Sequence, residues 1–285
     1  ITGVADAMID STPMVVICGQ VGVAMLGTDA FQEVDVVNVT NPISKWSYQI
    51  RRAEDVAWAV SRAFYIARTG RPGPVVLDFA KNAQTGMVEY KPEKVDFIRS
   101  YQPIPTMDEK AIEEAAYLIN HADRPLLLAG QGIELGNAHQ ELLNLIEKAD
   151  IPVGCTLLGL SDLPSDDPLN VGMLGMHGNL GPNVQTNQCD LLIAVGMRFD
   201  DRVTGNLNTY AKQAKIIHLD IDPSEINKNV KVDLAVLGDC KQTLAAVREK
   251  VHKIKHTAWV DSFKPYAKEE YEKVIDKAIH PKEGP

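Results

Sequence analysis

The chain has 285 residues, 45% of them hydrophobic and 24% charged, a balance typical of a globular protein with one large domain or two ordinary ones. The net charge of -9 argues against a nucleic-acid partner, and no apolar run approaches the roughly 20 residues that cross a bilayer, so no membrane is expected either. The four cysteines are scattered and no signal peptide is visible, so we expect a cytoplasmic protein with reduced thiols. Because the chain starts inside what reads as a helix and ends without a terminal element, we expect a piece of a longer protein.

The sequence pattern of residues 1–81 predicts part of an α/β domain. Two short, β-rich apolar runs, 13–20 and 73–80, are interpreted as buried strands, and residues 54–70 between them have helical spacing. The apolar face of this helix is expected to consist of Val56, Val60, Phe64 and Ala67. Strand, helix and strand at this spacing are typical of a parallel sheet.

A proline-rich stretch without a clean period, residues 82–105, is interpreted as a linker. A second domain is expected over 106–257. It begins with a helix at about 106–119, where Thr106 and Glu109 fit a capping box.

Short apolar strands alternate with helices through this second domain. The strands are expected at 125–129, 151–156, 190–195, 215–221 and 233–237. The helices are expected at about 136–149, 180–188, 224–229 and 239–253, and a tail, 258–285, is expected to hold one more at about 259–278 and to lead to a further domain. This alternation predicts a doubly wound parallel sheet, whose ligands bind at the carboxyl ends of the strands.

Small or polar residues follow each of these five strands, in the stretches "GQGIELG", "TLLG", "GMRFDDRVTG", "DID" and "GDC". Taken singly, each stretch can be explained by structure without a ligand. The glycines can form a tight turn, and "RFDDR" can be a solvated cluster of ion pairs. Together they favour a long ligand lying across the sheet edge. Arg71, Arg198 and Arg202 would then donate to a diphosphate, and Asp220 would accept from ribose hydroxyls.

Three further residues each have an ordinary structural interpretation. His177, in the glycine-rich segment "GMLGMHGNLGPN", is either a buried, hydrogen-bonded histidine or a contact to a flat ring. Lys81 directly follows the strand at 73–80 and has an ordinary surface reading, while Phe31, in a loop that enters a helix, is a core candidate. No second His, Cys or carboxylate stands at metal-ligand spacing, so no metal site built by this chain is expected.

Five stretches together resemble the large catalytic subunit of acetohydroxyacid synthase, also called acetolactate synthase: "GQVGVAMLGTDAFQE", "GRPGPVVLDFAKNAQ", "GMLGMHG", "GMRFDDRVTG" and "HLDIDPSEINKN". The similarity extends over essentially the whole chain, and "RFDDRVTG" is highly specific. The resemblance implies three α/β domains, of which this chain holds the later part of the pyrimidine-binding first domain and nearly all of the FAD-binding central one. It also implies that pyruvate is decarboxylated and its two-carbon unit joined to a second 2-keto acid, pyruvate or 2-ketobutyrate, with thiamine diphosphate, Mg²⁺ and FAD as cofactors.

By matching position, the resemblance assigns the following cofactor contacts: Phe31, Arg71, Gly130, Gln131, Gly132, Thr156, Leu157, Leu158, Leu174, Gly175, Met176, His177, Gly196, Arg198, Asp200, Arg202, Val203, Asp220, Ile221, Gly238 and Asp239. It places Gln32, Lys81, Asp201 and Arg202 beside the substrate channel, with Arg202 orienting the carboxylate of the incoming keto acid and Asp201 holding the guanidinium. The family's catalytic glutamate and its magnesium and diphosphate motif match no part of this sequence. The 285-residue piece alone is therefore expected to be inactive.

The resemblance further implies a homodimer or tetramer, with each active site between two subunits, and a regulatory small subunit as partner. Two alternatives stay open. One is another thiamine-diphosphate enzyme of the same build, such as glyoxylate carboligase, pyruvate oxidase or oxalyl-CoA decarboxylase. The other is a nucleotide-binding module without chemistry of its own.

Overall fold

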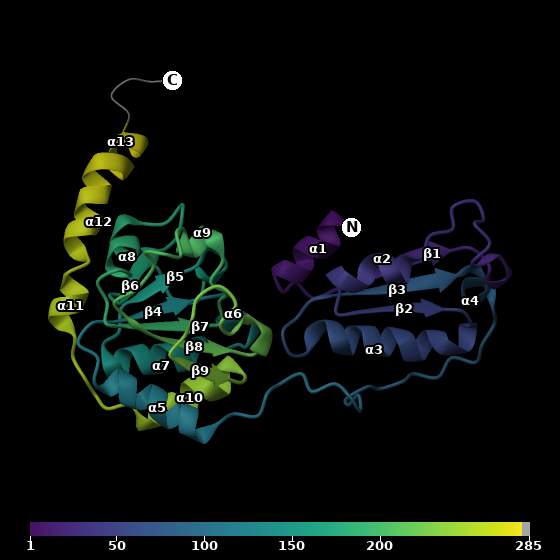
Figure 1. Ribbon diagram of the computed structural model, residues 1–285, viewed down its shortest axis with the longest axis horizontal. Helices are drawn as coiled ribbons and strands as arrows, with labels where there is room; N and C mark the ends of the chain where they lie inside the picture. Colours follow the sequence, from purple (N-terminus) through teal and green to yellow (C-terminus); the bar gives the residue numbers. More distant parts are fainter. Residues whose placement is uncertain (281–285) are drawn as a thin grey trace. The chain divides into compact units, whose positions relative to one another are not determined.

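The computed structural model describes residues 1–280, and the chain divides into two compact units, Ile1–Ile104 and a second that begins at Pro105 (Figure 1). Each unit is built on one all-parallel sheet, of three strands in the first and six in the second. This confirms the expected α/β class with a doubly wound parallel sheet. Over the described residues, no helix has both the length and the apolar character that a membrane span requires.

The sheet of the first unit has the strand order β1-β3-β2. Its central strand β3 (Pro74–Ala80) is the most buried, and β1 (Met14–Gln20) pairs along its whole length. Both lie where the apolar runs predict strands. The edge strand β2 (Trp46–Ile50) is an additional element, whose sequence "WSYQI" mixes polar and aromatic residues. Four helices complete the unit: α1 (Thr2–Ile9), α2 (Val36–Thr40), α3 (Val56–Arg68) and α4 (Lys81–Thr85).

The buried face of α3 agrees with the expected one except at Phe64, which is exposed. Ala67 is buried and Val56 and Val60 pack against the core, together with the buried Ala59 and Ala63. These alanines recur every four residues, and their small side chains let the helix approach the sheet closely. The expectation for Phe31 was also wrong, because 88% of this residue is exposed and it takes no part in the core.

The sheet of the second unit has the order β6-β5-β4-β7-β8-β9. The strands are β4 (Pro125–Ala129), β5 (Val153–Cys155), β6 (Asn170–Met173), β7 (Leu191–Val195), β8 (Lys215–Asp220) and β9 (Leu234–Leu237). Five of them match the predicted apolar runs, and β6 extends the sheet beyond β5. The chain winds outward from β4 in one direction and from β7 in the other, so the order of strands reverses between these two.

Helices cover both faces of this sheet. The helices that the structure describes in this unit are α5 (Glu109–Asn120), α6 (Gly132–Leu135), α7 (His139–Ala149), α8 (Leu180–Gln185), α9 (Asp201–Thr204), α10 (Cys240–Lys250), α11 (Thr257–Asp261), α12 (Lys264–Glu270) and α13 (Asp276–Ile279). In Figure 1, α5, α7 and α10 lie along one face. The opposite face is packed by aromatic side chains that follow α10, namely Trp259 and Phe263.

Several helix boundaries differ from those expected. The first helix is capped by Asp108, whose side chain accepts from the Lys110 backbone N–H, so the capping box at Thr106 was wrong. The expected helix at 224–229 is only a 3-10 turn, Pro223–Glu225, because Asp222 and Pro223 begin a turn that does not continue. The tail helix is broken at Ser262 and contains a π-helical turn, Tyr271–Ile275.

Alternate residues of the central strands supply two separate cores. Leu127 and Ile193 belong to the core beneath α5, α7 and α10, whereas Leu126, Leu128 and Leu192 belong to the core on the opposite face. All four cysteines are free. Cys155, Cys189 and Cys240 are buried, and burial raises the pKa of each thiol to about 12, while Cys18 is only partly buried.

Candidate functional site

The carboxyl ends of the six parallel strands meet at one edge of the second unit, and the residues that follow them are those that the sequence singles out. Gly130, Gln131 and Gly132 follow β4, and Thr156, Leu157 and Leu158 follow β5. Leu174, Gly175, Met176 and His177 follow β6, and Gly196, Arg198, Asp200, Asp201, Arg202 and Val203 follow β7. Asp220 and Ile221 end β8, and Gly238 and Asp239 follow β9. The structure thus brings these residues to one sheet edge.

The carboxyl ends of β4 and β7 are in direct backbone contact, at the point where the strand order reverses. The Gly132 backbone N–H donates to the Gly196 carbonyl oxygen at 2.9 Å, and a Cβ on Gly132 would lie 2.5 Å from the Gly196 Cα. A Cβ on Gly130 would lie 2.3 Å from the Met197 Cβ. Gly130 and Gly132 of "GQGIELG" are therefore required by contact between two strand ends, which is one of the roles that glycine plays in nucleotide-binding sheets.

The loop after β6 packs against the segment after β7. Gly175 has a φ of +100°, and a Cβ there would lie 2.6 Å from the Arg202 carbonyl oxygen. That same oxygen accepts from the Met176 backbone N–H at 2.7 Å. His177 in this loop is exposed, so the reading as a buried, hydrogen-bonded histidine was wrong. The shape of the loop is set by these protein contacts.

The segment "RFDDR" divides into an anchored part and an exposed part. Phe199 is buried and makes an edge contact with the His218 ring, with the two ring centroids 5.1 Å apart. The Asp200 carboxylate caps α9 by accepting from the Arg202 and Val203 backbone N–H groups, at 2.9 and 3.2 Å. Asp201 and Arg202 pair at 3.4 Å, and their side chains are 80% and 71% exposed. The exposed pair is therefore free to face a ligand at this edge.

Two further carboxylates of the edge are engaged with the backbone. Asp220 accepts from the Asp222 backbone N–H at 2.8 Å and lies 3.5 Å from the His218 Nε2. Asp239 caps α10 by accepting from the Lys241 backbone N–H at 3.0 Å. Each retains a second oxygen or lone pair that can accept from another donor.

The remaining predicted residues lie in the first unit. Lys81 begins α4, directly after β3, and Gln32 is exposed with a φ of +63°. The Arg71 side chain donates to the Ser11 hydroxyl at 2.9 Å and to the Ile9 carbonyl at 3.1 Å. A cavity of about 900 Å³ in this unit is lined by other residues, among them Glu33. Phe31, Gln32, Arg71 and Lys81 thus belong to a different unit from the edge described above.

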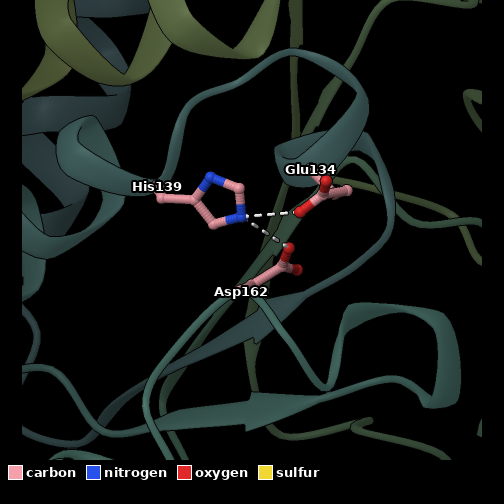
Figure 2. Close-up of side chains that lie close together, drawn as sticks. All are labelled: Glu134, His139 and Asp162. Atoms are coloured by element: carbon pink, nitrogen blue, oxygen red, sulfur yellow. Dashed lines mark ion pairs between the residues drawn. The ribbon is translucent and has the colours of Figure 1, made fainter.

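A group of three side chains that sequence analysis missed lies in the loops over β4 and β5. Figure 2 shows Glu134, His139 and Asp162 pointing toward one another. The His139 Nε2 is 2.9 Å from the Glu134 Oε2 and 3.9 Å from the Asp162 Oδ1. Spacing along the chain gave no signal for this group, because Asp162 is far from the other two in sequence and reaches them only when β5 pairs with β4.

Asp162 has an unusual environment for a carboxylate. Its side chain is fully buried, and neither oxygen has a hydrogen-bond partner. Burial, and secondarily the negative charge of Glu134, raises the pKa of Asp162 to about 7. A carboxyl group at this position changes its protonation close to neutral pH.

Comparison with known proteins agrees with this fold. Residues 112–247, which lie in the second unit, match the family "Thiamine pyrophosphate enzyme, central domain". The chain is a homologue of acetolactate synthase large subunits, which confirms the resemblance noted in the sequence.

The similarity to individual large subunits covers most of this chain. It is 43% identical over 270 residues to "Acetolactate synthase large subunit" of Corynebacterium glutamicum, covering 93% of this chain and 43% of the relative. It is 43% identical over 293 residues to the protein of that name from Parasynechococcus marenigrum, covering 99% and 47%. It is 45% identical over 248 residues to "Probable acetolactate synthase large subunit" of Methanocaldococcus jannaschii, covering 86% and 42%. The chain thus spans less than half the length of these relatives.

Proposed function

We propose that this chain forms the middle part of an acetolactate synthase large subunit, which decarboxylates pyruvate and condenses the two-carbon unit with pyruvate or 2-ketobutyrate. The observation that carries the proposal is the identity of 43% to the Corynebacterium glutamicum large subunit over 93% of the chain. The exposed pair Asp201 and Arg202 within "RFDDRVTG" supports it, because these side chains lie at a sheet edge where α/β proteins bind ligands. A cytoplasmic homodimer or tetramer with a regulatory small subunit is part of this proposal.

The second unit fits the FAD that the resemblance implies. Leu157, Leu158 and Met176 are large apolar side chains that stand exposed next to the strand ends, with 69% of Leu157 accessible. Apolar side chains grouped in this way are typical of a surface that a ligand covers. The joined tips of β4 and β7 provide the neighbouring backbone, and Asp220 would accept from ribose hydroxyls.

The chain's own residues would bind and orient the second substrate. Thiamine diphosphate, held with Mg²⁺ by other parts of the subunit, would supply the carbanion chemistry when bound. Arg202 would hold the carboxylate of the incoming 2-keto acid through charge-assisted hydrogen bonds, and Asp201 at 3.4 Å would restrain the guanidinium. Gln32 and Lys81 would line the substrate channel that the resemblance implies.

A direct test of cofactor binding uses the 285-residue chain. The purified chain is incubated with FAD and passed through gel filtration, and flavin absorbance is measured in the protein peak. We expect retention of FAD, and a large decrease for Leu158→Asp, which places a charge on the apolar surface. Tyr271→Asp, at an exposed position in the tail, serves as control. Equal retention by Leu158→Asp and the wild type would contradict the proposed FAD surface.

The activity is tested in a hybrid subunit. The matching segment of the Corynebacterium glutamicum large subunit is replaced by this chain, and acetolactate formation is measured with pyruvate alone and with added 2-ketobutyrate. In the hybrid, Arg202→Ala should raise the KM of the second substrate and alter the product ratio, while Arg202→Lys should retain part of the effect. An unchanged KM and product ratio would show that Arg202 has no such role. A substrate screen of the same hybrid separates this activity from those of glyoxylate carboligase, pyruvate oxidase and oxalyl-CoA decarboxylase.

A further inference from the structure

Three side chains of the second unit, two from helices and one from a loop, converge on one small region. Glu134 lies in the short helix after β4, His139 begins α7, and Asp162 follows the 3-10 turn Leu157–Gly159 after β5 (Figure 2). Each side chain offers one nitrogen or oxygen atom, and these three atoms lie within 4.8 Å of one another. The backbone fixes the Asp162 position, because its N–H donates to the Gly159 carbonyl at 3.0 Å.

The two carboxylates of this group offer more hydrogen-bond acceptors than His139 has donors to satisfy. The His139 Nε2 carries at most one hydrogen, and at 2.9 Å it is directed to the Glu134 carboxylate. The Asp162 Oδ1, at 3.9 Å from the same nitrogen, is beyond hydrogen-bond distance. Both Asp162 oxygens are buried and lack a hydrogen bond of normal geometry, and the Glu134 backbone N–H, which lowers the pKa of Asp162, offsets only part of the effect of burial. A buried carboxylate directed at a histidine and a second carboxylate must be neutralised by a proton or by a cation, and a cation would also bind the other two side chains.

We propose that Glu134, His139 and Asp162 bind a divalent cation of the zinc type. The neutral His139 Nε2 and one oxygen from each carboxylate would form three ligands, and a water would occupy the fourth position. The two carboxylates balance the charge of the ion, and the Asp162 oxygens gain the partner that the protein alone does not supply.

The observed distances are close to those that such an ion requires. With metal–ligand distances of roughly 2.0–2.2 Å, tetrahedral ligand atoms lie about 3.4 Å apart. The His139 nitrogen lies 2.9 Å from one carboxylate oxygen and 3.9 Å from the other, and all three ligand atoms lie within 4.8 Å of one another, so side-chain rotations would bring them to this spacing. Mg²⁺ and Ca²⁺ prefer oxygen ligands in larger number, and a histidine nitrogen favours a transition metal or zinc over both. This ion is thus different from the magnesium that acts with thiamine diphosphate, and the proposal does not depend on the proposed activity.

The test uses calorimetric titration of the chelator-treated 285-residue chain with ZnCl₂ at pH 7.5. We expect one site that is lost or weakened at least tenfold in Asp162→Asn and in His139→Gln, since even a second-shell partner is worth about 10- to 100-fold in affinity. Asp166→Asn and His252→Gln, which change exposed residues of the same types, are the matched controls and should bind zinc like the wild type. Glu134→Gln changes an exposed ligand and keeps the buried carboxylate, so it tests the site even if the Asp162 variant unfolds.

Substitution by Co²⁺ provides a second readout. A cobalt spectrum with nitrogen and oxygen ligands, without a thiolate charge-transfer band, is expected in the wild type and the controls and should disappear in Asp162→Asn. The proposal is wrong if zinc binds the wild type no more tightly than it binds Asp162→Asn and Glu134→Gln. It is also wrong if the cobalt spectrum shows a thiolate ligand, because the cation would then be held by a cysteine.

Discussion

Gly132 and Gly196 are in direct backbone contact, with the N–H of the first donating to the carbonyl oxygen of the second at 2.9 Å. This contact joins the ends of β4 and β7, the two strands between which the order of the sheet reverses. A side chain on either residue would separate the tips, since a Cβ on Gly196 would lie 2.6 Å from the Gly132 Cα. This edge of the sheet therefore depends on a backbone–backbone contact.

Gly132→Ala should destabilise the second unit by about 1–3 kcal/mol, because the added methyl group meets backbone atoms that cannot rotate away. Urea unfolding followed by Trp259 fluorescence measures the effect, since the other two tryptophans, Trp46 and Trp58, lie in the first unit. Gly181→Ala in α8 is the control, because its Cβ would meet its nearest neighbour at an ordinary 3.5 Å. Equal stability of the two variants would argue against a tight contact at Gly132.

The protonation of Asp162 should make stability fall as the pH rises. Its pKa of about 7 in the folded chain exceeds the value of roughly 3.9 in an unfolded chain, so between these values the folded state holds a proton that the unfolded state does not. The stability that proton binding to Asp162 contributes is fully present below the unfolded pKa of roughly 3.9, and it is lost as the pH rises through the folded pKa of about 7. Between pH 5 and pH 8, the unfolding free energy of the wild type should fall relative to Asp162→Asn by roughly 2–3 kcal/mol.

Urea unfolding of both proteins in the presence of EDTA provides this comparison, and EDTA keeps any bound cation from masking the effect. Asp166→Asn, at an exposed position, corrects for the general loss of one carboxylate. A difference that stays constant across the pH range would show that Asp162 is ionised in the folded chain throughout.

The indole of Trp259 should stabilise the second unit through one hydrogen bond. Its Nε1–H donates to the buried Pro125 carbonyl at 2.7 Å, and its ring makes an edge contact with Phe263 at 5.2 Å. Trp259→Phe keeps an aromatic ring but leaves the carbonyl without a partner, so we expect a loss of about 1–3 kcal/mol. Circular dichroism during thermal unfolding measures this, with Tyr271→Phe at an exposed position as control. A melting temperature equal to that of the control would mean that water replaces the indole.

Asp239 should contribute as a helix cap as well as a candidate cofactor contact. Its carboxylate accepts from the Lys241 and Gln242 backbone N–H groups at the start of α10. Asp239→Ala should cost about 0.5–2 kcal/mol of stability, while Asp239→Asn keeps an acceptor and should cost much less. If both variants retain less FAD than the wild type, although only Asp239→Ala is destabilised, the carboxylate has a separate binding role. Urea unfolding and flavin retention are measured on the same samples.

The strands of the second sheet were predictable where they are continuous apolar runs. The run at 125–129 corresponds to β4 without a shift, and that at 190–195 differs from β7 by one residue. Buried parallel strands carry this signal because both of their faces pack against helices. The strands β2 and β6 gave no such signal, since they are short edge strands with polar residues whose pairing depends on distant neighbours.

The candidate edge was predictable because residues after parallel strands must meet at one side of the sheet. Expectations about individual side chains failed where those side chains depend on packing between distant segments. Phe64 is apolar and correctly spaced, yet alanines form the buried face of α3. The approach of Asp162 to His139 is likewise set by the pairing of β5 with β4, which no local pattern encodes.

The contrast between Cys18 and the three buried cysteines has a practical consequence. With pKa values of about 12, Cys155, Cys189 and Cys240 carry almost no thiolate at neutral pH and are shielded from reagents. A maleimide dye should therefore label the folded chain at Cys18 alone and reach the others only when the second unit opens. The rate at which further label appears, resolved by mass spectrometry, would time that opening in an unmodified chain.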